Sequence, residues 1–296
     1  MGSTLYQRAR QLELIVGGER VVLTAVHSKS SAKGRRLLLL HGNPGNLDDF
    51  AELFSKLDFA GEVLAIDLPG FGRSAPAPAS SSALTLSDLA RVAFAAADAC
   101  GWSTFEIIGH SHGGGVAQAM AWNAHPRVQR ITLLGTLGTP AHASYRQLAL
   151  PGAGAAMQLV GKCLSLPGSK SWFRLLQRSI AKQAFHPEPV PPEHLERGVD
   201  AMLAAPTILC SMVRVALGNP CQALAKNVAS IASAVTFIHG ELDALVPSRH
   251  ARNLHELRVE AGQPSAFVLV PNAGHMLLLT HPELVAQHAR GDSGAI

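Results

Sequence analysis

The residues around Ser111 have the types and spacing needed for nucleophilic catalysis. Ser111 is the centre of a G-x-S-x-G pattern with Gly109 and Gly113, after a short apolar run and before a segment that can continue as a helix. A serine on such a sharp turn has a strained backbone, so its near neighbours must lack bulky side chains. Its hydroxyl would lie beside a helix N-terminus, where free N–H groups can stabilise an oxyanion. The pattern therefore predicts a nucleophilic serine.

A base, and an acid to orient it, follow later in the chain. A nucleophilic serine needs both groups to become reactive. His275 follows the apolar segment 266–270, so it is expected at the carboxyl end of a strand. Asp243 follows the apolar segment 235–239 in the same way. The expected chemistry is acyl transfer to water, in which His275 accepts the serine proton and Asp243 stabilises the resulting imidazolium.

Four separated segments resemble the α/β-hydrolase superfamily, and the similarity covers nearly the whole chain. They are residues 37–45 (LLLLHGNPG), residues 67–74 (DLPGFGRS), the turn at Ser111, and the two loops that hold Asp243 and His275. The order serine, aspartate, histidine along the chain is also that of the α/β-hydrolases. Glu241 lies two residues before Asp243 and is the alternative acid, but the resemblance favours Asp243.

The same resemblance implies where an oxyanion would bind. One donor would be the backbone N–H of Asn43, in the loop after His41-Gly42, and the other would be the backbone N–H of His112. The Asn43 amide would also tune the pocket. Resembling enzymes that remove halides or open epoxides use an aspartate nucleophile, whereas this chain has Ser111 at that position. The resemblance therefore favours acyl transfer.

Strand and helix patterns alternate over most of the chain, and these elements must position the reactive residues. Segments 11–16 and 20–27 flank Gly17-Gly18, which indicates a hairpin. Further strands are expected at 36–41, 63–66, 105–108, 130–135, 235–239 and 266–270, and helices at 47–57, 85–100 and 116–125. This alternation predicts an α/β fold with a mostly parallel, doubly wound sheet and ligands at the carboxyl ends of its strands.

The pattern changes between residues 139 and 226. Strand-like runs vanish there, and prolines at 187–192 form a stiff break that cannot be helical. Helices are expected at 155–166, 171–185, 192–203 and 207–217. The resemblance implies that residues 139–226 are a helical cap, inserted after the sixth strand of the sheet and lying over Ser111. Residues 1–138 and 227–296 would form the hydrolase core.

The expected substrate is a small apolar molecule, namely an ester or thioester whose acyl group fits beneath the cap. Trp172, Met202 and Met212 are expected to influence which acyl chains fit, since one methylene is worth only ~1–3 kcal/mol in such a pocket. By the resemblance, the same residues could instead cleave a C–C bond, release a product from a carrier protein or support a lyase. A small-ligand receptor and a partner-docking role for the apolar cap are further alternatives.

Composition excludes several other function classes. The 296 residues carry a net charge of +4 with scattered Lys and Arg, which gives no support for nucleic-acid binding.

The four cysteines show no C-x-x-C spacing and are expected to be free thiols in a reducing compartment. No signal peptide and no apolar run near the ~20 residues of a membrane span is found, so a cytoplasmic location is expected. The fourteen histidines form no metal-binding motif, so neither a metal nor a cofactor is expected, and the oligomeric state is left open.

Overall fold

The computed structural model describes residues 4–29, 34–77, 82–124, 126–139, 143–164 and 166–291. The strands are β1 (Arg10–Val16), β2 (Glu19–Lys29), β3 (Arg35–Leu40), β4 (Gly61–Ile66), β5 (Phe105–His110), β6 (Val128–Leu134), β7 (Ala234–Gly240) and β8 (Ser265–Val270). Within the described residues they form one sheet in the order β1-β2-β4-β3-β5-β6-β7-β8. In the described residues, strands β3 to β8 run parallel to one another, and β2 pairs in the antiparallel sense with both β1 and β4. The predicted mostly parallel α/β sheet is confirmed.

Local sequence explains how the sheet begins and why its centre is buried. Gly17 and Gly18 have φ values of +60° and +85°, a backbone region that glycine adopts without strain, and they form the predicted turn between β1 and β2. The leucines at 37–40 in β3 are all fully buried. A continuous apolar run of this kind is typical of a parallel strand covered on both faces.

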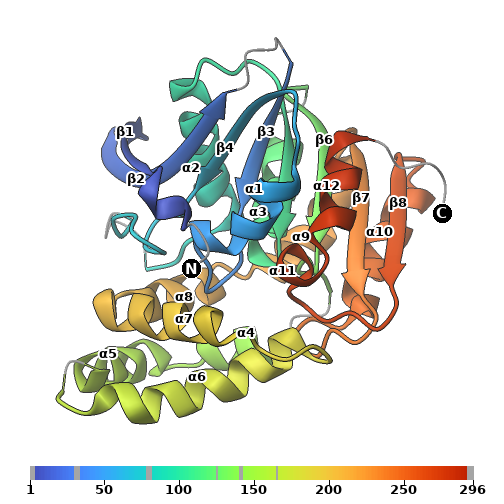
Figure 1. Cartoon of the computed structure of the whole chain (residues 1–296). Helices are drawn as coiled ribbons and strands as arrows, with labels where there is room; N and C mark the ends of the chain where they lie inside the picture. Colours follow the sequence, from blue (N-terminus) through green and yellow to red (C-terminus); the bar gives the residue numbers. More distant parts are fainter. Residues whose placement is uncertain are drawn as a thin grey trace.

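Helices cover both faces of the sheet (Figure 1). One apolar core contains residues of α2 (Leu86–Ala99), α3 (His112–Ala124) and α10 (Ser248–Glu260). A second core contains residues of α1 (Ala51–Lys56), α11 (Leu277–Thr280) and α12 (Pro282–Arg290). The short 3-10 helices are η1 (Leu5–Gln7), η2 (Leu47–Phe50) and η3 (Val228–Ser230). The doubly wound arrangement expected from the sequence is therefore present.

Two predicted helices differ in detail from the structure. The segment expected as one helix at 47–57 is η2 followed by α1, and Asn46 caps its start with a capping box. Helix α3 begins at His112, four residues before the predicted start at 116, and residue 125 at its predicted end lies outside the described residues. Three consecutive glycines, 113–115, suggest a turn by propensity. A Cβ on Gly113 would lie 2.2 Å from the Leu40 carbonyl oxygen and one on Gly114 would lie 2.3 Å from the Thr136 hydroxyl, so close packing requires glycine at both positions inside this helix.

A helical insertion lies between β6 and β7. Its helices are α4 (Ala143–Leu148), α5 (Ala153–Leu164), α6 (Ser169–Phe185), α7 (Pro192–Ala204), α8 (Ile208–Leu217) and α9 (Pro220–Asn227), of which α4 and α9 were not expected from the sequence. Figure 1 shows α4 to α8 beyond the carboxyl ends of the parallel strands, with α5 and α6 farthest from the sheet. In the described part of the chain no single helix is long and apolar enough to cross a membrane; α7 and α8 meet that test only as a pair bent by 90°.

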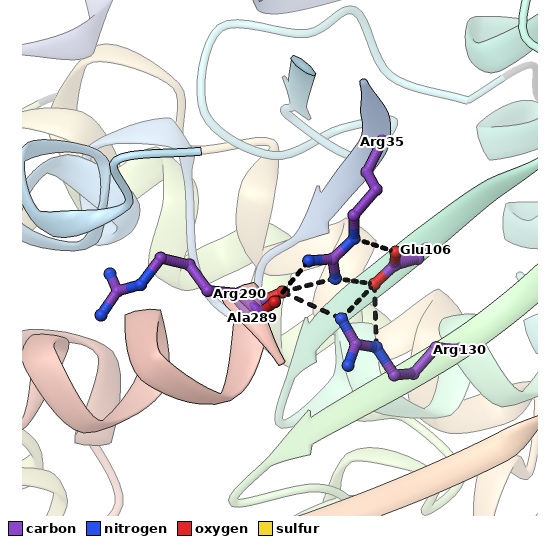
Figure 2. Close-up of polar contacts among 5 residues, drawn as sticks. All are labelled: Arg35, Glu106, Arg130, Ala289 and Arg290. Carbon is purple, nitrogen blue, oxygen red and sulfur yellow. Dashed lines mark hydrogen bonds and ion pairs between the residues drawn. The ribbon is translucent and has the colours of Figure 1, made fainter. Parts of the chain in front are cut away.

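An ion-pair cluster near the amino ends of the parallel strands, away from the insertion, holds the C-terminus of α12 (Figure 2). Glu106 pairs with Arg35 and Arg130, which extend from the two strands flanking its own. Both guanidinium groups also donate to the Ala289 carbonyl oxygen, at 2.6 and 3.0 Å, and Arg35 reaches the Arg290 carbonyl oxygen at 2.6 Å. These contacts satisfy carbonyls that a helix end leaves unpaired and place positive charge at the negative end of the helix dipole.

Candidate active site

Ser111 lies at the turn between β5 and α3, at the carboxyl end of a central strand. Its φ is +51°, a left-handed conformation that a residue with a side chain adopts only where its surroundings enforce it. A Cβ on Gly109 would lie 2.5 Å from the Gly113 carbonyl oxygen, and a Cβ on Gly113 would lie 2.2 Å from the Leu40 carbonyl oxygen. Backbone packing therefore requires both glycines of the pattern.

His275 and Asp243 form a buried hydrogen-bonded pair. Asp243 follows β7 and His275 follows β8, so both leave the carboxyl ends of neighbouring parallel strands. His275 Nδ1 lies 2.7 Å from Asp243 Oδ2. An ionised carboxylate only accepts, so Nδ1 carries the proton and Nε2 keeps a free lone pair. That lone pair is what a general base uses to accept a serine proton.

The Asp243 carboxylate has partners on both oxygens. Oδ1 accepts from the backbone N–H groups of Leu245 and Val246, at 3.0 and 2.7 Å. Oδ2 lies 3.1 Å from His239 Nε2 as well as facing His275. Burial alone would raise the pKa of Asp243, but the neighbouring His275 and the hydrogen bonds from both histidines outweigh it and hold that pKa below its usual range. The contact with His239 was not expected from the sequence, because a histidine inside a buried strand looks like a core residue.

Ser111 and His275 line the same cavity, which has a volume of about 180 Å³. The Ser111 side chain makes no hydrogen bond to the residues that the structure describes, so its hydroxyl is left for a ligand or for His275. Residues 42–46, 48, 49 and Met276 form one wall of the cavity. Helices α6 and α7 supply the other, with Gln177, Ile180, Ala181, Arg197, Ala201 and Met202 among its residues. The structure thus brings the three predicted residues to one site. Of these three side chains, only those of Asp243 and His275 are hydrogen-bonded to each other.

The two predicted oxyanion donors, Asn43 and His112, come from loops beside Ser111. A Cβ on Gly42 would lie 3.1 Å from the Ser111 Cβ, so the loop that holds Asn43 passes directly against the serine. His112 is the first residue of α3, where backbone N–H groups have no partner within the helix. Both residues therefore belong to segments that lie directly beside Ser111.

Tyr145, from α4 of the insertion, links these two residues through their side chains. Its hydroxyl lies 3.2 Å from His112 Nδ1, and Asn43 Nδ2 donates to it at 3.4 Å. Burial raises the pKa of the Tyr145 hydroxyl well above its usual value. Sequence reasoning missed this residue, since nothing in the local pattern of the short helix α4 marks one tyrosine as special.

Other histidines near Ser111 are buried and neutral. Burial lowers the pKa of His41 to about 4 and the pKa values of His110 and His112 to about 3. His110 Nε2 donates to the His275 carbonyl oxygen at 3.1 Å, and the two rings lie 4.8 Å apart. Burial also raises the pKa of Asp49, on the cavity wall, to about 7. These three rings support the site by packing and hydrogen bonding, whereas the ring of His275 is paired with the Asp243 carboxylate.

The insertion directly contacts the loop that carries His275. The His275 backbone N–H donates to the Ala184 carbonyl oxygen at the end of α6, at 3.0 Å. A Cβ on Gly274 would lie 2.0 Å from the His186 carbonyl oxygen, so only glycine fits at that approach. Met276, next to His275, packs in a small apolar cluster with Ala184 and Phe185 of α6. The position of His275 therefore depends on the insertion as well as on the sheet.

Only one of the three insertion residues expected to shape the pocket lines the cavity. Met202 does so, on α7. Met212 packs against the main core instead, and Trp172 lies on the outer side of α6, where it is 43% exposed. Helical periodicity identifies apolar sides of a helix, but it does not tell which of two such sides faces the sheet.

Comparison with known proteins identifies a family model and several relatives that are similar to this chain. The family model described as alpha/beta hydrolase fold matches residues 35–155. The pimeloyl-[acyl-carrier protein] methyl ester esterase of Pectobacterium carotovorum is 28% identical over 250 residues, which cover 83% of this chain and 89% of that protein. The dihydrolipoyllysine-residue acetyltransferase component of the acetoin cleaving system of Pseudomonas putida is 27% identical over 260 residues, 86% of this chain and 62% of that protein. The corresponding protein of Cupriavidus necator is 33% identical over 112 residues, 38% of this chain and 29% of its own length. The chain thus spans less than two thirds of the length of these two acetyltransferase components.

Solved structures agree on the fold. An esterase from Thermogutta terrifontis superposes with a TM-score of 0.73 at 21% identity, covering 96% of this chain and 97% of that one. A probable hydrolytic enzyme from Pseudomonas aeruginosa gives a TM-score of 0.75 at 19% identity, covering 99% and 96%. The chain therefore has the α/β-hydrolase fold.

Proposed function

We propose that this chain is a serine hydrolase that cleaves a carboxylic ester or thioester with an apolar acyl group. The observation that carries the proposal is a strained serine, Ser111, that lines the same cavity as His275, whose Nδ1 is hydrogen-bonded to the buried Asp243. A relative of comparable length is named as a methyl ester esterase, which supports the reaction class. The cytoplasmic location expected from the sequence stays a prediction.

Acylation begins when Ser111 Oγ attacks the substrate carbonyl carbon. His275 Nε2 accepts the hydroxyl proton as the Oγ–C bond forms, and the carbonyl π electrons move to its oxygen. The Asn43 and His112 backbone N–H groups stabilise this oxyanion. The tetrahedral intermediate collapses, the bond to the leaving alcohol or thiol breaks, and His275 gives its proton to the leaving group.

Deacylation repeats the same steps with water as the nucleophile. His275 Nε2 takes a proton from water as the water oxygen attacks the acyl carbon. The bond to Ser111 Oγ then breaks, the carboxylic acid leaves, and the proton returns to the serine. Asp243 stays ionised throughout and stabilises the imidazolium in both halves of the reaction.

The insertion acts in this proposal as a cap that selects the acyl group. Ile180 and Met202 on the cavity wall provide apolar contacts, while Ala181 and Ala201 leave room between them. The 139–226 segment supplies no member of the Ser111, Asp243 and His275 set. Its role is to exclude water and to discriminate acyl groups by shape.

A panel of p-nitrophenyl esters and acyl thioesters of increasing chain length tests the proposal. We expect turnover that depends on the serine, so Ser111→Ala should lower kcat by three orders of magnitude or more, roughly as loss of a triad member does elsewhere. Ser103→Ala, at an ordinary turn before β5, is the matched control and should keep its activity. Saturable ligand binding without turnover in the wild type would favour a receptor and contradict the proposal.

A further inference from the structure

The outer side of the insertion exposes an unusual concentration of large apolar side chains. Of the thirteen exposed large hydrophobic residues in the described part of the chain, seven lie between residues 150 and 180. We define the α5–α6 face as six of them: Leu159, Leu166, Trp172, Leu175, Leu176 and Ile180. Their exposed fractions range from 43% to 69%, so nothing in the described chain covers them. Contiguous exposed apolar patches of this kind mark interaction sites.

Helical spacing joins these residues into one surface. On α6, Trp172, Leu175 and Leu176 are spaced by three and four residues, so they project from the same side of the helix. Phe173 is buried on the inner side. Trp172 and Leu159 also line one groove between α5 and α6. Helix α6 is thus apolar both toward the cavity and toward the outside.

The charged residues of the α5–α6 segment all have the same sign. All five charged residues between 150 and 186 are basic: Lys162, Lys170, Arg174, Arg178 and Lys182. Lys170 and Arg174 pair with Asp200 and Glu196 on α7. The remaining three, on the exposed surface, have no acidic partner among the described residues. The face therefore presents apolar side chains beside three uncompensated positive charges.

We propose that the α5–α6 face binds an anionic lipid surface. Tryptophan and leucine suit the boundary between headgroups and acyl chains, and neighbouring Lys and Arg attract anionic headgroups. Long basic side chains can bury their stems along the apolar surface while their charges reach the headgroups. A second copy of this chain fits the face less well, because two-fold pairing would bring the same unneutralised cations together.

The position of this face gives the binding a consequence for catalysis. Ile180 belongs both to the α5–α6 face and to the wall of the cavity that contains Ser111. Gln177 and Ala181, one turn or less away on α6, also line that cavity. An apolar ester dissolved in a lipid layer would therefore lie beside the edge of the cavity. This consequence rests on the proposed function, whereas lipid binding itself does not.

Vesicle sedimentation of the Ser111→Ala protein tests the binding without turnover. We expect binding to vesicles of phosphatidylcholine mixed with phosphatidylglycerol, weaker binding to phosphatidylcholine alone, and a decrease with salt. Leu175→Gln with Leu176→Gln, and separately Arg178→Gln with Lys182→Gln, should each weaken binding about tenfold or more. Ile15→Gln removes an equally exposed apolar side chain on β1 and should bind as the parent does.

Tryptophan fluorescence locates the contact independently. Of the three tryptophans, Trp102 is buried, Trp122 is half-buried against the core and Trp172 is exposed on the α5–α6 face. Anionic vesicles should therefore shift the emission to the blue, and Trp172→Phe should abolish that shift. Melting curves confirm that each variant is folded. Absence of binding to anionic vesicles, equal loss in the Ile15→Gln control, or a dimer in light scattering that the leucine variants dissociate would each overturn the proposal.

Discussion

Replacing Asp243 by asparagine should remove most activity while leaving the site in place. Asp243 Oδ1 accepts two backbone N–H groups, from Leu245 and Val246, so the asparagine carbonyl must take that position. The new NH₂ group would then face His275 Nδ1, at the 2.7 Å separation now spanned by a hydrogen bond. Two donors cannot share that contact. His275 would therefore move its proton to Nε2 and lose the lone pair that accepts the Ser111 proton.

The magnitude follows from this change of tautomer. Loss of the correct tautomer lowers kcat about 10⁴-fold in serine proteases, which corresponds to ~5 kcal/mol of transition-state stabilisation. KM should change little, because Asp243 does not line the cavity. The assay is p-nitrophenyl ester hydrolysis, with circular dichroism melts to show that the variant is folded.

Glu241→Gln is the matched control for this experiment, since Glu241 is the alternative acid two residues away. Among the described residues, its Oε2 accepts one hydrogen bond, from the Asn272 backbone N–H at 3.3 Å on the exposed surface. Activity should stay within about twofold of the wild type. Folded Asp243→Asn protein with kcat near the wild-type value, or an equal loss in Glu241→Gln, would refute the assignment of Asp243.

Three further predictions concern the cavity and its neighbours. Tyr145→Phe leaves the Asn43 and His112 side chains without their shared partner, so the free energy of unfolding in urea should fall by about 1–3 kcal/mol and kcat should drop modestly. Unchanged stability would contradict this role. Met202→Ala should move the best p-nitrophenyl ester toward longer chains; an unaltered chain-length profile in folded protein would show that Met202 does not set the limit. Burial lowers the pKa values of three histidines and raises that of Asp49 to about 7, so the two kinds of group act oppositely on stability. The histidines bind more protons in the unfolded state, so their contribution to the unfolding free energy falls as pH falls from about 6.5 to about 3. Asp49 binds more protons in the folded state, so its contribution falls as pH rises from about 4 to about 7. Asp49→Asn should thus steepen the acid-induced fall in unfolding free energy between these pH values, and a shallower slope would contradict the sign.

Elements with strong local signals could be predicted from the sequence. The alternation of strands and helices, the Gly17-Gly18 turn, and the loops after β7 and β8 all follow from patterns within a few residues. Asp243 and His275 could be placed at strand ends for that reason. Their approach to each other follows from parallel pairing of β7 with β8, which the fold resemblance implies.

Features that depend on long-range packing could not be predicted in this way. Tyr145 reaches Asn43 and His112 only because α4 lies beside the loop after β3 and the first residue of α3. Trp172 was expected in the pocket wall, but α6 is apolar on two sides and its tryptophan faces outward. The contact of the insertion with the His275 backbone likewise joins residues that are distant in sequence.

Covalent labelling of the nucleophile tests the central proposal most directly. The folded protein would be incubated with a p-nitrophenyl alkylphosphonate, digested and mapped by peptide mass spectrometry. We expect one adduct on Ser111, formed with loss of p-nitrophenol, and no adduct in Ser111→Ala. Labelling should be strongly slowed in His275→Ala, because the serine then lacks its base. An adduct on another residue, or no adduct in folded wild-type protein, would contradict a mechanism built on Ser111.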